Sequence, residues 1–164
     1  LRTLERVGSW EAGLWVHDNI GNARATMFSP AMFERYFMPR YAKLISACKA
    51  AGCRHVYFNS NGNLNGILDM LLDAGFDGLQ PLEPGCGMDL YKMREKYGKR
   101  IVFFGGVCNS RVLPRGDRAE IERHVLPLIE LGSEGGLVIG THTIGSDISP
   151  ESYDRRFLKS ACEQ

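Results

Sequence analysis

Short runs of apolar residues alternate along the chain with longer segments whose apolar positions recur at helical spacing. Five apolar runs are short enough for strands and end in polar residues or glycine. They cover residues 13–18, 55–58, 78–82, 101–104 and 137–139. The pattern predicts five β-strands, each followed by a helix.

Capping residues predict where the helices begin and end. Ser29 precedes Pro30, an N-cap followed by the residue best suited to the first helical position, and Pro39 is expected to kink or divide that helix. Further helices are predicted after Asn63, Asp89, Asp117 and Ser149, with stops at Gly75 and Gly98 and the last helix running toward Ala161.

Repeated strand–helix units predict a parallel α/β sheet with right-handed crossovers. No linker or low-complexity segment divides the chain, so residues 1–164 are expected to form one domain. Two architectures fit five units of this size. One is a complete flavodoxin-like doubly wound sheet, and the other is five-eighths of a TIM-type (β/α)8 barrel, which takes about 250 residues. Periodicity does not separate them.

Ligands of both architectures bind at the carboxyl ends of the parallel strands. Asp18 and His142 follow the first and last strands, and a carboxylate and an imidazole suit acid–base catalysis. The expected substrate-binding residues are Asn59, Asn61, Gln80, Glu83, Gly105 and Gly106. The alternative interpretation is that such residues are caps and turns, since Asn and Gly favour those positions.

Three residues after the third, fourth and fifth strands form an alternative metal site: Cys86, Cys108 and His142. Thiolates and imidazole bind zinc, but the spacing here is long and irregular, so we expect no metal. Gly105 and Gly106 follow a strand without the GxGxxG pattern or a Walker lysine, which argues against a dinucleotide or P-loop site. We expect no cofactor.

Composition narrows the classes of partner. The chain has 20 Lys+Arg against 19 Asp+Glu, so no strongly basic surface predicts nucleic-acid binding. No apolar run approaches the roughly 18 residues of a membrane helix. The five cysteines are scattered and form no CxxC pair, which predicts a reducing cytoplasm and not a disulfide framework.

Several segments in the same order and spacing resemble the uroporphyrinogen decarboxylase superfamily, which includes corrinoid-dependent methyltransferases. The resemblance runs from roughly Trp15 to Tyr153 and corresponds to the carboxyl-terminal part of the family domain. The segments are Asp18 with 28–33, 39–41, 59–63, 75–84, 105–107, 112–113, 135–136, and His142 ahead of 149–151.

The resemblance implies a (β/α)8 barrel whose strands four to eight are present here. It also implies a tetrapyrrole or methylated small molecule as substrate, or a corrinoid protein as partner. Decarboxylation of a pyrrole acetate needs one group to hold the protonated ring and another to manage the proton, roles that suit Asp18 and His142. A non-catalytic ligand-binding or assembly module derived from the barrel is the alternative function.

The departures from the family leave catalysis open. The methyltransferases carry a zinc-binding His-x-Cys pair where this chain has Asn59 and Asn61, and neutral amides do not replace those ligands. The decarboxylases use an amino-terminal catalytic region that this sequence does not contain. Cys108 stands where the family often has aspartate.

Five strands of a barrel leave two unpaired sheet edges and exposed apolar surface. We therefore expect the chain to be part of a longer protein, to pair with a complementing half-barrel, or to form a homodimer.

Overall fold

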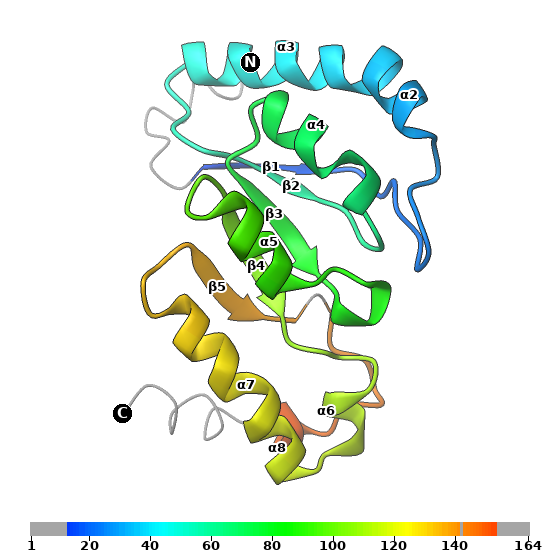
Figure 1. Ribbon diagram of the computed structural model, residues 1–164, viewed down its shortest axis with the longest axis vertical. Coiled ribbons are helices and arrows are strands. Elements are labelled where there is room, and N and C mark those ends of the chain that lie inside the picture. The colour runs from blue at the N-terminus through cyan, green and yellow to red at the C-terminus, as the bar shows by residue number, and fades with distance from the viewer. Residues whose placement is uncertain (1–12, 142, 154–164) are drawn as a thin grey trace.

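The computed structural model describes residues 13–141 and 143–153 and contains one parallel sheet. All five predicted strands are confirmed, with bounds shifted by a residue or two (Figure 1). They are β1 (Leu14–His17), β2 (Val56–Asn59), β3 (Gly78–Leu82), β4 (Val102–Gly106) and β5 (Leu137–Gly140).

The strands lie in the order β1-β2-β3-β4-β5, so each strand pairs with its neighbours in the sequence. A doubly wound sheet reverses its strand order at a switch point, and no reversal occurs here. The flavodoxin-like alternative is therefore wrong. Consecutive parallel strands with connecting helices instead define a partial TIM-type barrel.

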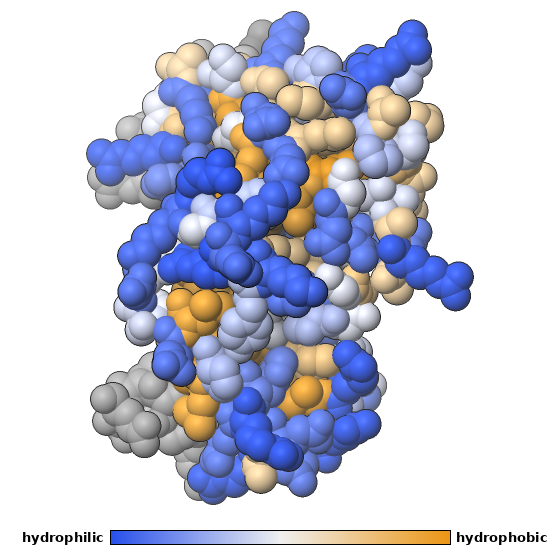
Figure 2. Space-filling view, in the orientation of Figure 1, coloured by the Kyte–Doolittle hydropathy of each residue, from blue (hydrophilic) through white to orange (hydrophobic). Residues whose placement is uncertain are grey.

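The helices that connect the strands lie on one side of the sheet (Figure 1). They are α2 (Pro30–Met32), α3 (Met38–Ala50), α4 (Leu68–Asp73), α5 (Leu90–Tyr97), α6 (Val112–Arg115), α7 (Arg118–Gly132) and α8 (Pro150–Tyr153), with a π-helical turn η1 (Phe33–Phe37) and 3-10 turns η2 (Asn65–Ile67) and η3 (Pro84–Cys86). Hydrophilic side chains cover much of this helical side (Figure 2). None of the helices within the described ranges is long and apolar enough to cross a membrane.

Several predicted caps are confirmed by hydrogen bonds. The Ser29 hydroxyl accepts from the Met32 amide at 3.2 Å, and the Asp117 carboxylate accepts from the Glu120 amide at 2.8 Å. Asp89 caps α5 in the same way. The expected division of the first helix does not occur as a break, because the π-helical turn η1 joins α2 to α3, which contains Pro39, and the backbone stays right-handed helical through the junction. The predicted continuation of the last helix toward Ala161 lies outside the described residues.

The two faces of the sheet have different surroundings. Phe58, Leu79 and Phe103 are at most 1% exposed and pack against the helices. Because side chains alternate along a strand, the intervening residues project to the opposite face. We call this the inner face, and its members are Trp15, His17, Tyr57, Asn59, Gln80, Phe104 and Val138. Val138 is 52% exposed, so part of this face is open to solvent.

Candidate functional site

Asp18 follows β1 and is held by the helix layer. Its Oδ2 atom accepts a hydrogen bond of 2.6 Å from the Tyr41 hydroxyl on α3. Tyr41 is itself buried beside Phe58 and Phe76. Burial raises the pKa of Tyr41, and the hydrogen bond to Asp18 and its negative charge raise it further. One Asp18 oxygen is thus bound to a neutral phenol on the side away from the inner face.

Asn59 and Gln80, which were both predicted to bind substrate, lie in contact on the inner face. The Asn59 side-chain amide donates to Gln80 Oε1 at 3.1 Å, and the two residues are register partners on β2 and β3. His17 is the register partner of Asn59 on β1 and is exposed. We call His17, Asn59 and Gln80 the polar row. Our sequence prediction did not include His17, although its alternation with Trp15 placed both on one face.

An aromatic cluster lies on the amino-terminal side of the polar row. Ring centroids of Trp15 and Tyr57 are 4.9 Å apart, those of Trp15 and Phe104 are 4.8 Å apart, and Tyr57 and Phe104 meet edge-on at 5.1 Å. Such tilted and edge-on pairs are favourable arrangements of aromatic rings. We call these three residues the aromatic floor. Gly78 lies between them, since an added Cβ would come within 2.7 Å of the Tyr57 ring.

Glu83 and Asn61 occupy the loops beside the polar row. A Glu83 carboxylate oxygen accepts a 2.7 Å hydrogen bond from the Gly62 amide, which holds the loop after β2 against the end of β3. The Asn61 backbone amide donates to Asn19 Oδ1 at 3.2 Å, and the residue itself is exposed. Glu83 therefore has a structural contact, and the role of either residue in substrate binding stays a prediction.

Ser60 fixes the loop after β1 beside the loop after β2. Its fully buried hydroxyl accepts from the Ile20 amide at 3.1 Å and donates to the Asn61 carbonyl at 3.2 Å. The Asn, Ser and Gly residues of this loop predicted a turn. They did not predict the hydrogen bond between Ser60 and Ile20, because the two residues are 40 positions apart in the sequence.

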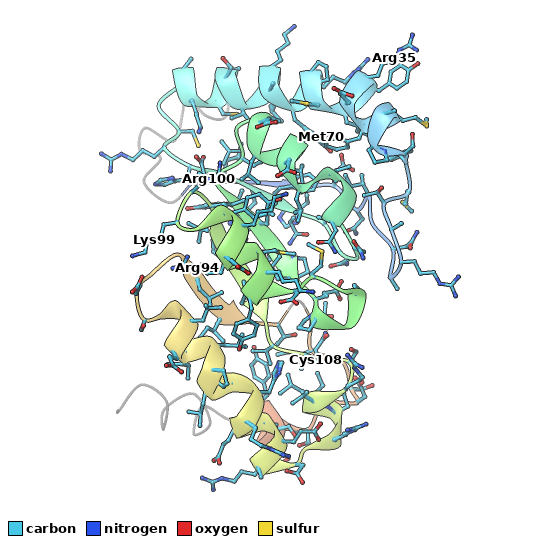
Figure 3. All side chains as sticks on the ribbon, in the orientation of Figure 1. Arg35, Met70, Arg94, Lys99, Arg100 and Cys108 are labelled. Carbon is cyan, nitrogen blue, oxygen red and sulfur yellow. The ribbon has the colours of Figure 1, made fainter. Side chains whose placement is uncertain are left out.

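Cys86 and Cys108 line a hollow of about 400 Å³ between the loops after β3, β4 and β5. Figure 3 labels Cys108, which lies where β4 leads toward α6. Burial opposes ionisation of Cys108, but hydrogen bonds from the Ser110 hydroxyl and from backbone amides of Val112, Ser110 and Arg111 outweigh it and lower its pKa. Burial raises the pKa of Cys86, and the neighbouring Glu83 carboxylate adds to the increase.

The two cysteines of the alternative zinc trio thus share a hollow, while His142 lies outside the described residues. Within residues 13–141 and 143–153, no group of three His, Cys, Asp or Glu side chains is arranged to hold a metal ion. Asn59 and Asn61 also do not fit the zinc site of the methyltransferase branch, because neutral amides lack the donor strength of imidazole and thiolate. Asn59 and Asn61 therefore cannot serve as the zinc ligands of such a site.

Gly105 and Gly106 have a steric reason for being glycine. Gly105 has a φ of +125°, and an added Cβ would lie 2.7 Å from the Leu82 amide nitrogen on β3. Gly106 has a φ of +90°, and its carbonyl lies 3.1 Å from His124 Nε2. That nitrogen also accepts from the Cys108 amide at 3.0 Å, and burial lowers the pKa of His124. A substrate-binding role for the two glycines stays a prediction.

The consecutive parallel strands and their connecting helices are those of a TIM-type α/β barrel. The sequence model of the uroporphyrinogen decarboxylase family matches residues 14–155. The chain therefore belongs to the uroporphyrinogen decarboxylase family. This confirms the family suggested by the sequence segments.

A solved structure has the same fold. It is described as a methyltransferase from Methanosarcina mazei, with a TM-score of 0.70 and 23% sequence identity. The alignment covers 93% of this chain and 42% of that one, so the chain spans less than half the length of this relative. No curated protein matched the chain.

Proposed function

We propose that the chain provides the carboxyl-end binding face of a uroporphyrinogen decarboxylase-type barrel and acts on a tetrapyrrole or a methylated corrinoid. The observation that carries this proposal is the layering of the inner face. The aromatic floor supplies an apolar surface of mutually tilted rings, and the polar row supplies hydrogen-bonding groups next to it. Ligand sites commonly combine a mainly apolar lining with a few placed polar groups.

The proposed reaction in the decarboxylase case uses Asp18 and His142 as the groups that hold the ring and move the proton. Asp18 follows β1 and His142 follows β5, which are the two outer strands of the sheet. Methyl transfer from a corrinoid is the related reaction for the same face.

A non-catalytic ligand-binding module is the second candidate, and the Asp18–Tyr41 hydrogen bond favours it. A carboxylate whose Oδ2 atom is bound to a buried phenol has less freedom to approach a substrate. This candidate keeps the inner face as a binding surface and assigns Asp18 to holding α3 against the end of β1.

The sheet edges support a proposal about partners. Among the described residues, β1 pairs only with β2 and β5 pairs only with β4, which leaves one side of each outer strand without a strand partner. Unpaired strand edges favour pairing with another strand. We propose that further barrel strands complete the ring, from a longer protein of which this chain is a part, from a complementing half-barrel or from a second copy of this chain. A corrinoid protein is the proposed partner in methyl transfer.

Calorimetric titration tests the proposed ligand classes directly. Uroporphyrinogen and methylcobalamin are each titrated into the chain, and carbon dioxide release and loss of the cobalt-bound methyl group are then measured. We expect saturable binding of one ligand, and weaker binding of it by Trp15→Ala. Binding with turnover supports the enzyme, and binding without turnover supports the module. Binding of neither ligand contradicts the proposal.

A matched control tests whether any loss is local to the inner face. Tyr91 is 49% exposed on α5, in the helix layer. Tyr91→Ala therefore removes an aromatic ring without touching the aromatic floor, and ligand binding should be unchanged. An equal loss of binding by Tyr91→Ala and Trp15→Ala would contradict a site on the inner face.

A further inference from the structure

The amide pair on the inner face has hydrogen-bonding capacity that it does not use. Asn59 and Gln80 are linked by a single hydrogen bond, and neither makes another side-chain hydrogen bond within the described ranges. Each carboxamide has two N–H donors and an oxygen that accepts two hydrogen bonds. One amide–amide contact therefore leaves donors and acceptors available on both residues, whichever amide donates.

The unused donors and acceptors of the two amides match a particular kind of ligand group. A ligand group that presents one acceptor and one donor side by side can receive a hydrogen bond from one amide and donate to the other. A carboxamide or a lactam has this edge. An ionised carboxylate has acceptors only, so it would satisfy the amide donors and leave the amide oxygen facing a negative charge.

The charges around the amide pair also favour an uncharged ligand. None of the residues in β1 to β5 is Lys, Arg, Asp or Glu. The acidic residues closest in sequence to the polar row are Asp18 after β1 and Glu83 after β3. A ligand with many carboxylates would therefore meet no Lys or Arg side chain on the strands, whereas an uncharged ligand needs no such partner.

The aromatic floor adds an apolar surface beside the amide pair. Trp15 and Tyr57 are register partners two positions before His17 and Asn59, so the floor adjoins the amide pair on the same face. Aromatic side chains offer a large apolar contact area. A ligand with an apolar ring and an amide at its edge would use both features together.

We propose that the Asn59–Gln80 pair is a subsite for the neutral carboxamide or lactam edge of a ligand that carries an apolar ring. The inference deepens the proposed function and rests on it for the location of the ligand on the inner face. It also distinguishes between the two ligand classes, because a corrinoid carries carboxamides at its periphery and a uroporphyrinogen carries carboxylates.

Benzamide and benzoate form a matched pair of probes for this subsite. They have the same ring and differ in replacing an amide by a carboxylate. Each is titrated into the isotopically labelled full chain, and the side-chain amide signals of Asn59 and Gln80 and the indole signal of Trp15 are followed by NMR. We expect benzamide to shift all three signals and to bind about tenfold more tightly than benzoate.

Two variants distinguish specific binding at the Asn59–Gln80 pair from nonspecific apolar binding to the aromatic floor. Asn59→Leu keeps a side chain of similar size without hydrogen-bonding groups, and we expect it to weaken benzamide binding about tenfold while leaving the weak benzoate binding unchanged. Asn65→Leu is the control, because Asn65 is exposed and donates to the Gly87 carbonyl away from the inner face. It should bind benzamide as the parent chain does.

Other outcomes overturn the inference. Equal or tighter binding of benzoate would do so, as would benzamide binding that Asn59→Leu leaves intact or that shifts no signal on the inner face. Failure of the proposed function alone would give a different result. Benzamide would then still bind at Asn59 and Gln80 more tightly than benzoate, but neither uroporphyrinogen nor methylcobalamin would bind.

Discussion

The hydroxyl of Tyr41 donates a 2.6 Å hydrogen bond to the carboxylate of Asp18, across 23 positions of the sequence. This contact joins the loop after β1 to α3 and fixes one carboxylate oxygen of Asp18. The phenol comes from the buried side of the sheet, where Tyr41 contacts Phe58 and Phe76 edge-on. Asp18 is therefore both a candidate catalytic residue and an anchor of the helix layer.

Tyr41→Phe should lower the free energy of unfolding by about 1.5 kcal/mol, because it removes a hydrogen bond to a charged group and keeps the buried ring. Denaturant unfolding followed by circular dichroism measures the change. Tyr91→Phe is the matched control, since Tyr91 is about half exposed, and it should change stability by less than about 0.5 kcal/mol. Equal effects of the two variants would show that the Asp18 contact adds nothing.

Gly62→Ala should destabilise the chain more than Gly52→Ala, by about 1–3 kcal/mol. Both glycines have a positive φ, +87° and +92°, so both alanines incur similar backbone strain. An added Cβ at Gly62 would lie 2.6 Å from the Asn22 carbonyl oxygen, whereas nothing lies within 4 Å at Gly52. Thermal or denaturant unfolding of the two variants isolates the cost of the close approach. No difference between them would contradict the packing of the two loops.

Cys108 and Cys86 should give stability–pH curves of opposite slope. The lowered pKa of Cys108 means that its ionisation stabilises the folded chain above the unfolded thiol pKa of about 8.5, and this contribution is lost as the pH falls through the folded pKa. The raised pKa of Cys86 means that its contribution is present below the unfolded pKa and is lost as the pH rises through the folded pKa.

Unfolding measured under reducing conditions across the thiol range tests this pair. The stability difference between the parent chain and Cys108→Ala should grow with rising pH, and the difference for Cys86→Ala should shrink. A common slope for both variants would contradict the separate environments assigned to the two thiols.

The open sheet edges predict self-association of the isolated chain. Light scattering after size exclusion should give a homodimer that dissociates on dilution, because the unpaired edges of the outer strands favour strand pairing between copies. Val138→Lys places a charge on an exposed position of β5 and should weaken the dimer. A monomer at all concentrations would contradict the homodimer and leave a complementing half-barrel as the proposed partner.

Much of the fold followed from the sequence because its determinants are local. Apolar runs bounded by polar residues predicted five strands, and Ser29, Asp89 and Asp117 marked helix starts that their hydrogen bonds confirm. Strand order is a non-local property, so periodicity left two architectures open. The family resemblance favoured the barrel, and the pairing of consecutive strands decided the choice.

The site was predictable only in part. The rule that ligands meet parallel strands at their carboxyl ends selected Asn59 and Gln80, which do lie together. The same rule selected Asp18 without revealing Tyr41, because that contact depends on how α3 packs against the sheet. Gly105 shows a further limit, since its close approach to Leu82 is a steric requirement that a glycine in the sequence does not distinguish from ligand binding.

Hydrogen–deuterium exchange with and without methylcobalamin or uroporphyrinogen tests the central claim, that the ligand binds on the inner face, most directly. We predict that the ligand which binds slows exchange in 15–19 and 57–63, where β1 and β2 end beside the polar row, and leaves α5 and α7 unchanged. Protection confined to the helix layer, or no protection by either ligand, would contradict a binding site on the inner face.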